Sequence, residues 1–186
     1  MSNINYVACN MQSGTIQAIN FLIDKGHRVI GMINGPEKLL ACQERQDGYM
    51  KAMARNRLKF DPFLLISTDL STEMVYEATR QLLSSKRKPT AIVAFNDYVA
   101  LDAVQYARKE KRKINKDICF VSYANLPITN YTAFPPLASV EQFPYQQGQK
   151  AMETLLELID SKKDDSEVAT YFKIILDSQL IIHKNK

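Results

Sequence analysis

The sequence predicts an α/β fold, a doubly wound parallel sheet with helices on both of its faces. Short apolar runs alternate with longer segments of helical periodicity along nearly the whole chain, a pattern typical of parallel βαβ units. Residues 89–102 contain both patterns in succession. Ala91–Phe95 carries no polar residue, as expected for a strand covered on both faces, and Val99 and Ala103 recur at helical spacing after Asp97.

Each element follows from one of these two patterns. The predicted extended segments are residues 4–8, 29–33, 63–66, 91–95, 118–123, 137–140, 171–176 and 179–182. The predicted helices are one that ends at Lys25, one over residues 40–56, one after Ser71, one that begins at Asp97 and one over residues 145–160. Ser71 and Asp97 are residue types that accept a backbone N–H bond at a helix start, and we expect both to be caps.

Several of the predicted helices show an apolar face, among them the first and the last. In the last helix we expect the stripe to point inward. The first face carries Ile16, Ile19, Leu22 and Ile23, and the last Met152, Leu155, Leu156 and Ile159.

Composition is that of a globular protein with an ample core: 186 residues, 46% of them hydrophobic. No apolar run approaches the roughly 20 residues that span a bilayer, and the N-terminus lacks the features of a signal peptide. We therefore expect a cytoplasmic protein without a membrane partner. The three cysteines lie far apart and indicate neither a disulfide framework nor a zinc site.

The net charge of +4 comes partly from two basic clusters, at residues 86–88 and 108–113. Both follow a predicted helix. Cations there complement the helix dipole, and we favour this interpretation over a nucleic-acid surface.

Enzyme motifs are missing from the sequence. Its six glycines form neither a dinucleotide loop nor a Walker phosphate loop. His27 and His183 have neither a nucleophile elbow nor metal-ligand spacing. We predict no enzymatic activity, no cofactor and no metal.

Several short motifs occur in order along almost the whole chain. They are a Gly-His turn at 25–30, Asn-Gly-Pro at 34–36, Arg-x-x-Gly at 45–48, the strand-to-helix stretch at 89–100, Asn-Lys-Asp-Ile at 115–118, Pro-Pro-Leu at 135–137 and Val-Glu-Gln at 140–142. Together they resemble the effector-binding domain of the LacI/GalR family of bacterial transcription regulators.

The resemblance implies a periplasmic-binding-protein-like fold whose second lobe is complete and whose first lobe is truncated. Residues 26–141 and 164–186 would form the second, effector-binding lobe, and residues 1–25 and 142–163 would be the remnant of the first. No DNA-binding domain is expected, so DNA would be contacted only through a domain missing from this chain. Because strands of the first lobe are missing, we expect Ile16, Ile19 and Ile23 to be uncovered and the chain to form a homodimer.

The resemblance also implies a set of ligand contacts. A guanidinium, a carboxylate and several amides suit a polyhydroxylated molecule, so the expected effector is a small sugar or sugar derivative. Asn125 is included because its neighbour Ala124 stands where the family often places a ligand-binding Asp. The expected ligand-binding residues are Ser13, Arg45, Asn96, Asp97, Asn125 and Gln142.

The predicted function is that of the effector-sensing and dimerisation portion of a LacI-type transcription regulator, with a small sugar-like ligand between two lobes. The alternative is a solute-binding protein of a sugar transporter, which shares the two-lobed fold. A helix-turn-helix upstream of Met1 would identify a regulator, and a signal peptide there would identify a transporter component.

Overall fold

The computed structural model describes residues 4–161 and 171–183. The strands in this part of the chain are β1 (Tyr6–Asn10), β2 (Ile30–Asn34), β3 (Leu65–Ser67), β4 (Ala91–Ala94), β5 (Cys119–Tyr123), β6 (Ala138–Glu141), β7 (Lys173–Asp177) and β8 (Gln179–Ile182). The helices are α1 (Met11–Asp24), α2 (Leu40–Arg55), α3 (Thr72–Ser84), α4 (Asp97–Lys109) and α5 (Pro144–Ser161), with short 3-10 turns η1 (Pro62–Leu64) and η2 (Pro127–Tyr131).

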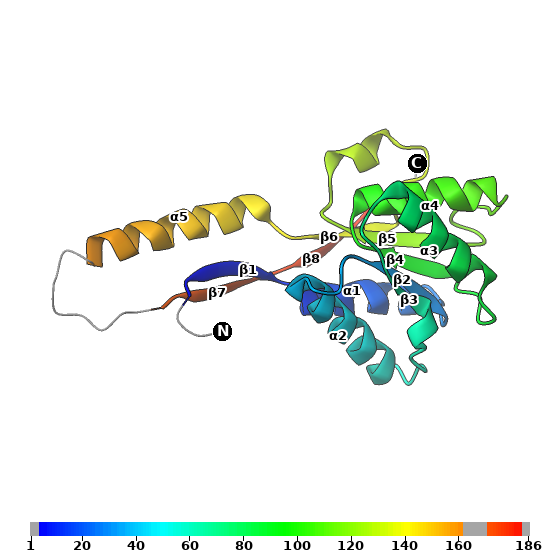
Figure 1. Cartoon of the computed structure of the whole chain (residues 1–186), viewed down its shortest axis with the longest axis horizontal. Coiled ribbons are helices and arrows are strands. Elements are labelled where there is room, and N and C mark those ends of the chain that lie inside the picture. Colours follow the sequence, from blue (N-terminus) through cyan, green and yellow to red (C-terminus); the bar gives the residue numbers. More distant parts are fainter. Residues whose placement is uncertain (1–3, 162–170, 184–186) are drawn as a thin grey trace.

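These elements form a body and an arm (Figure 1). The body is built on a six-stranded sheet in the order β3-β2-β4-β5-β6-β8, parallel except for β8, which runs antiparallel to β6. The arm consists of α5 and the parallel pair β1–β7, and it projects to the left of the body in Figure 1.

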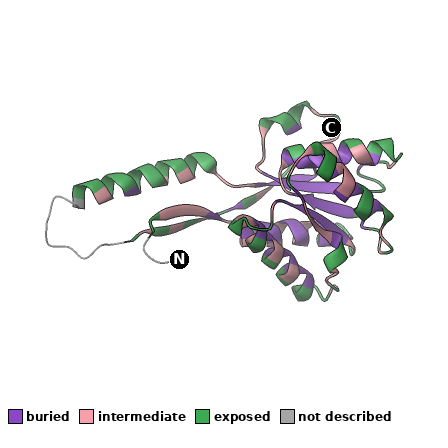
Figure 2. Ribbon diagram, viewed as in Figure 1, coloured by how far each residue is buried: buried purple, intermediate pink, exposed green. Residues whose placement is uncertain are grey.

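Side chains of the central strands alternate between two core layers. On β4, Ala91 and Val93 pack with residues of α1 and α2, whereas Ile92 and Ala94 pack with residues of α3 and α4. All four are buried, because helices cover both faces of the sheet (Figure 2). This explains why the strand is an uninterrupted apolar run in the sequence. The predicted doubly wound α/β fold is confirmed.

Polar side chains fix two helix starts. Ser71 caps α3 as predicted, because its hydroxyl accepts a bond from the Met74 N–H. At α4 the prediction that Asp97 is the cap was wrong. The cap is Asn96, whose side-chain oxygen accepts from the Val99 N–H at 2.9 Å, and this leaves the Asp97 carboxylate free for contacts inside the body.

Helix α1 lies in the body. Ile19 and Leu22 are fully buried in the layer that α1 shares with α2 and the sheet, and Ile23 is 7% exposed. The expectation that Ile19 and Ile23 would be uncovered was therefore wrong. The structure also groups segments differently from the predicted lobes: α1, expected in the first lobe, packs on the body, and β7, expected in the second, pairs with β1 in the arm.

The chain passes between body and arm at three places, which lie together in a region that we call the crossing region. They are Asn10, between β1 and α1; Gln142–Phe143, between β6 and α5; and Ser178, between β7 and β8. The Ser178 hydroxyl donates to the Asn10 carbonyl at 2.9 Å. A Cβ on Gly14 would lie 2.5 Å from the Ser178 hydroxyl oxygen, so the close approach of these segments requires glycine there.

Helix α1 also covers part of the free edge of the six-stranded sheet. The side-chain amide of Gln17 donates to the Ser178 carbonyl and accepts from the Leu180 N–H, both at 3.0 Å. Gln17 thereby bonds to backbone groups on the outer side of β8, where no further strand of the sheet follows among the described residues.

The apolar face of α5 was expected to point inward, and this expectation was wrong. Met152, Leu155, Leu156 and Ile159 are each at least half exposed, because in the described part of the chain α5 packs mainly on β1 of the narrow arm (Figure 2). None of the helices described is long and apolar enough to cross a membrane.

Candidate cleft between body and arm

A hollow of about 520 Å³ lies where the arm meets the body. We call it the Arg45 cleft. It is open at the carboxyl ends of β4 and β5, where ligands bind in sheets of this kind. Its walls come from β1 and the α1 start, the first turns of α2, the loops after β4 and β5, and the segment leading into α5. The residues are Val7, Ala8, Cys9, Met11, Leu40, Ala41, Glu44, Arg45, Phe95, Asn96, Ala124, Gln142 and Gln147.

Arg45 is the buried cation of this cleft. Its guanidinium carbon lies 4.3 Å from the ring centre of Phe95 and 4.0 Å from that of Tyr123, so two aromatic rings hold it. One terminal nitrogen donates to the Phe95 carbonyl at 3.0 Å. Burial lowers the pKa of Arg45 from its ordinary value, an effect that the nearby Tyr123 opposes.

The charge of Arg45 is not neutralised by a carboxylate. No ion pair joins it to any residue within 4–161 and 171–183, and its Nε, which is buried, has no hydrogen-bond partner there. A buried cation without an anionic partner is costly. The guanidinium is therefore suited to acceptor groups of a bound molecule.

The Tyr123 ring, on which the Arg45 guanidinium stacks, is itself held in place by a hydrogen bond. It is fully buried, and its hydroxyl donates to the Thr15 hydroxyl at 2.6 Å, which in turn donates to the Met11 carbonyl. Burial raises the pKa of Tyr123. The contact ties β5 to the first turn of α1, so that the ring below Arg45 is fixed by two elements.

Three of the six predicted ligand residues line the cleft: Arg45, Asn96 and Gln142. Asn96 caps α4 with its oxygen and presents its amide at the end of β4. Gln142 comes from the crossing region, and its carbonyl accepts from the Gln147 side chain at 2.6 Å. The cleft thus brings a guanidinium together with directed amides.

Asp97 follows the cleft residue Asn96 and is fully buried. Its carboxylate accepts hydrogen bonds from the hydroxyls of Ser122 and Ser139 and from the Leu126 N–H, the last at 2.6 Å. It therefore joins the α4 start to β5, β6 and the loop after β5. Asp97, a predicted ligand residue, is therefore not part of the lining of the cleft.

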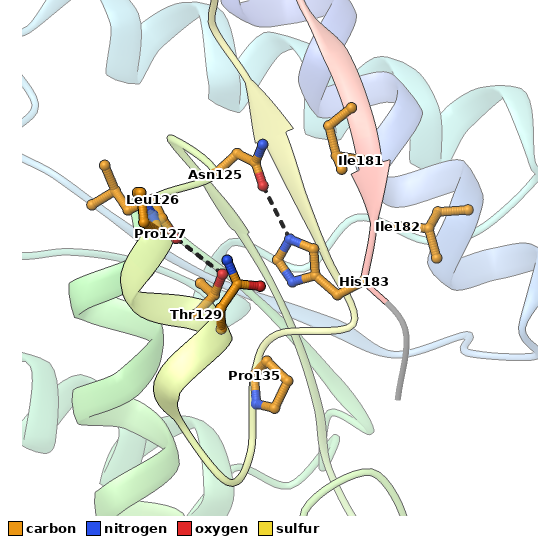
Figure 3. Close-up of a pocket in the computed structure, with 9 residues that line it drawn as sticks. Asn125, Leu126, Pro127, Thr129, Pro135, Ile181, Ile182 and His183 are labelled. Atoms are coloured by element: carbon orange, nitrogen blue, oxygen red, sulfur yellow. Dashed lines mark hydrogen bonds between the residues drawn. The ribbon is translucent and has the colours of Figure 1, made fainter. Parts of the chain in front are cut away.

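Asn125 faces a second hollow of about 560 Å³, which lies between η2 and β8 (Figure 3). Its side chain points to His183, whose Nε2 lies 3.2 Å from the Asn125 Oδ1. The neighbouring Ala124 lines the Arg45 cleft instead. Both residues have positive φ, 88° at Ala124 and 52° at Asn125, and this tight turn directs the two side chains to different hollows.

Ser13 lies in the first turn of α1. Its N–H donates to the Asn10 side chain at 2.9 Å, and its hydroxyl accepts from Gln17 at 3.4 Å. Both contacts are within the helix start. The structure therefore places Ser13 beside the crossing region, outside the lining of the cleft.

The sequence interpretation did not include Glu44 and Gln147, which also line the cleft. Glu44 precedes the predicted Arg45 on the same helix turn, and Gln147 lies one turn into α5. Glu44 is next to Arg45 in the sequence, whereas Gln147 is five residues after Gln142 and in a different element, so sequence spacing alone does not single it out. Phe95 and Tyr123 were predicted only as strand residues, and their contact with Arg45 was not predicted.

The geometry of body, arm and cleft agrees with a match to a known family. Residues 19–175 match the family described as periplasmic binding protein-like domain, and the chain belongs to this family. It is homologous to repressors of the LacI family. The HTH-type transcriptional repressor CytR of Escherichia coli K12 is 32% identical over 145 residues, which are 78% of this chain and 42% of that repressor.

Solved structures show the same relationship. A LacI-family regulatory protein from Chloroflexus aggregans superimposes with a TM-score of 0.88 at 30% identity, over 99% of this chain and 64% of that one. The regulator CelR, solved as a cellobiose complex, superimposes with a TM-score of 0.87 at 26% identity, over 96% and 53%. The chain thus spans less than two thirds of the length of these relatives.

Proposed function

We propose that this chain is the effector-sensing part of a LacI-type transcription regulator and that its effector is a sugar or sugar derivative bound in the Arg45 cleft. The observation that carries the proposal is the unneutralised Arg45 guanidinium, fixed between two rings beside the amides of Asn96 and Gln142. Such donors suit the oxygens of a polyhydroxylated ligand. The regulators among its relatives, including CelR with cellobiose, favour this function over the transporter alternative.

Residues at the cleft have two roles in this proposal. Arg45, Asn96 and Gln142 contact the ligand, and Glu44 and Gln147 extend the polar wall. Asp97, Asn125 and Ser13 hold the loops and the helix start that carry those contacts. Ligand binding in the cleft then favours one arrangement of arm and body, and the DNA-binding part of a longer regulator would respond to that arrangement.

Calorimetric titration tests the site. The full chain is titrated with cellobiose and with a panel of neutral sugars and sugar phosphates. For a sugar that binds, Arg45→Lys should weaken the affinity about tenfold or more, because lysine keeps the charge but loses the planar fork of donors. Asn96→Ser, which retains a capping oxygen but loses the amide, should weaken it as well.

Gln149→Ala is the matched control. Gln149 is exposed on α5, where it bonds to Glu153 at 3.2 Å, and its loss should leave the affinity unchanged. Unfolding curves of each variant show whether it remains folded. A bound sugar whose affinity is the same in wild type, Arg45→Lys and Asn96→Ser would place the site elsewhere.

We also propose that the chain assembles as a homodimer through its exposed apolar surface. The side chains that α5 exposes form one continuous stripe at helical spacing, and stripes of this kind are normally covered by a partner.

A further inference from the structure

The carboxylate of Glu141 occupies a special place in the crossing region. Glu141 is the last residue of β6. One of its oxygens accepts from the Asn125 side-chain amide at 3.0 Å, and the other accepts from the backbone N–H groups of Gln142 and Phe143, both at 2.8 Å. One half-buried carboxylate thus bonds two segments that follow different strands.

Both segments have backbone conformations that must be held in place. Ala124 and Asn125 have φ values of 88° and 52°, and Phe143 has a φ of 51°. Residues other than glycine rarely adopt this region, and Asn tolerates it better than Ala or Phe. Glu141 supplies hydrogen bonds to both turns, which compensates for their strained backbone.

Both segments also belong to the Arg45 cleft. Ala124 lines it from the turn after β5, and Gln142 lines it from the connection to α5. The side chain of Gln147, in the first turn of α5, bonds to the Gln142 carbonyl, so the start of α5 follows the position of Gln142. A shift of either wall would be transmitted to the other through the Glu141 carboxylate.

The amide of Asn125 has a defined orientation. Its nitrogen donates to Glu141, since a carboxylate only accepts, and this leaves its oxygen facing His183 Nε2 at 3.2 Å. The other ring nitrogen of His183 lies 2.9 Å from the Pro136 carbonyl. The turn after β5 is thus held between the end of β8 and the end of β6.

We propose that Glu141 is a positioning residue of the Arg45 cleft, which couples the turn at Ala124–Asn125 to the connection at Gln142–Phe143 and so to the start of α5. The assignment of the cleft as an effector site rests on the proposed function. The coupling rests on the hydrogen bonds alone, and it is the route by which a ligand that touches Ala124 or Gln142 would reorient the arm.

Residue-resolved amide hydrogen exchange of the full chain, followed by NMR without any ligand, tests the coupling. Asn125→Gly keeps a residue that tolerates positive φ but removes the amide that bonds to Glu141. Exchange of the Gln142 and Phe143 amides should accelerate about tenfold although neither residue is changed, since their shared acceptor loses its third partner and is free to move.

Glu141→Gln is the second variant, and it should accelerate exchange on both sides, at Leu126 as well as at Gln142 and Phe143. Glu153→Gln, on the exposed face of α5, is the control and should change none of these rates. The proposal is overturned if Asn125→Gly leaves the Gln142 and Phe143 rates unchanged. It is equally overturned if exchange rises uniformly, including at the buried Val93, because that result indicates only global destabilisation. Since no ligand is used, a failure of the proposed effector site would not affect the outcome.

Discussion

Asp97 shows how a single buried side chain can hold several elements of the body together. It is fully buried and accepts bonds from Ser122, Ser139 and the Leu126 N–H. Asp97→Asn replaces one accepting oxygen by a donor that faces other donors. We expect the free energy of unfolding to fall by about 1–3 kcal/mol, the usual cost of a buried polar group that loses its partner.

Urea unfolding measures this change. Asp102→Asn is the matched control, because Asp102 lies on the same helix and accepts from the Thr72 hydroxyl in a solvent-exposed contact. It should alter stability by less than about 0.5 kcal/mol. Equal effects of the two substitutions would mean that the Asp97 network contributes little.

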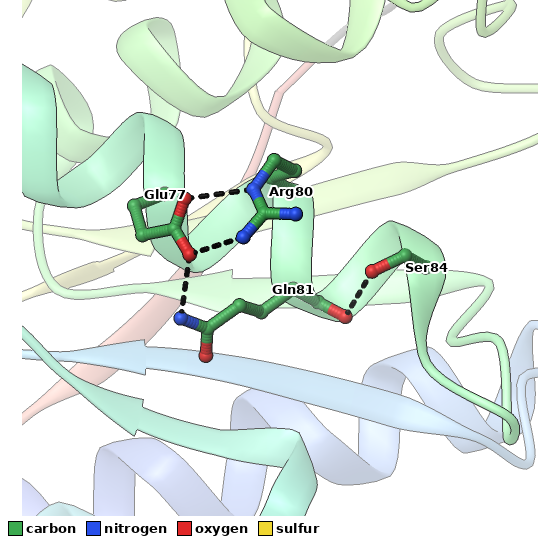
Figure 4. A network of polar contacts seen from close by, with 4 residues as sticks. All are labelled: Glu77, Arg80, Gln81 and Ser84. Atoms are coloured by element: carbon green, nitrogen blue, oxygen red, sulfur yellow. Dashed lines mark hydrogen bonds and ion pairs between the residues drawn. The ribbon is translucent and has the colours of Figure 1, made fainter.

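Glu77 gives a residue-scale prediction about pH. Its carboxylate bonds to the Arg80 guanidinium at 2.6 and 2.7 Å and to the Gln81 amide at 2.8 Å, on the exposed side of α3 (Figure 4). These bonds hold its pKa at about 2, below the ordinary value of 4.5. Because the folded state binds this proton more weakly than the unfolded state, the contribution to stability is present above pH 4.5 and is lost as the pH falls towards 2.

Arg80→Ala should therefore raise the pKa of Glu77 towards 4.5, as followed by NMR of the side-chain carboxyl carbon. The stability of this variant and that of wild type should converge as the pH approaches 2. Arg108→Ala serves as the control, since Arg108 stacks on Phe134 and should leave the Glu77 titration unchanged. An unaltered Glu77 pKa in Arg80→Ala would show that the ion pair does not form in solution.

At the scale of elements, two helical glycines differ sharply in their surroundings. In α2, a Cβ on Gly48 would lie 2.6 Å from the Gln12 carbonyl and 2.7 Å from the Thr15 Cβ, so α1 and α2 approach closely only because this residue is glycine. In α5, a Cβ on Gly148 would meet nothing within 4 Å. The same substitution should therefore have opposite effects.

Gly48→Ala should lower the free energy of unfolding by about 1–3 kcal/mol, because overpacking outweighs the better helix propensity of alanine. Gly148→Ala should raise it by up to about 1 kcal/mol, since only the propensity changes. Thermal unfolding of both variants provides the comparison. A stabilised Gly48→Ala variant would contradict the tight α1–α2 packing.

The elements of the body were predictable because each central strand is one apolar run and each helix has a periodic face. The strand-to-helix change at residues 91–97 was located correctly, although the cap is one residue earlier than predicted. The partner of a helix face was not predictable. The stripes of α1 and α5 look alike in the sequence, but α2 and the sheet cover the first, whereas the second is exposed.

The candidate site was predictable to a similar degree. Arg45, Asn96 and Gln142 were predicted as site residues from the motifs that contain them, and all three line the cleft. The roles of Asp97 and Asn125 depend on partners 16 to 58 residues away, such as Glu141, Ser122 and His183, which no local pattern reveals. Long-range hydrogen bonds therefore decided which polar side chains face the cleft.

At the scale of the whole molecule, the exposed stripe of α5 leads to a prediction about assembly. Met152, Leu155, Leu156 and Ile159 are 57%, 50%, 54% and 50% exposed. We expect light scattering of the chain to show a dimer, since covering this surface removes apolar area from water. Leu156→Lys should shift the species towards monomer, because dimerisation would then bury a charge.

Tyr98→Lys controls for a general effect of surface charge, since Tyr98 is 60% exposed on α4, an element of the body and not of the arm. It should leave the dimer intact. A wild-type chain that remains monomeric at high concentration would refute assembly through α5.

The bonds between Gln17 and the outer side of β8 bear on how readily the chain can aggregate. An unpaired strand edge is a template on which another chain can add its own strand, and such additions lead to intermolecular aggregation. With its amide on the Ser178 carbonyl and the Leu180 N–H, Gln17 occupies two of the backbone groups that an incoming strand would need. We therefore expect this one side chain of a neighbouring helix to hinder the addition of a foreign strand to β8.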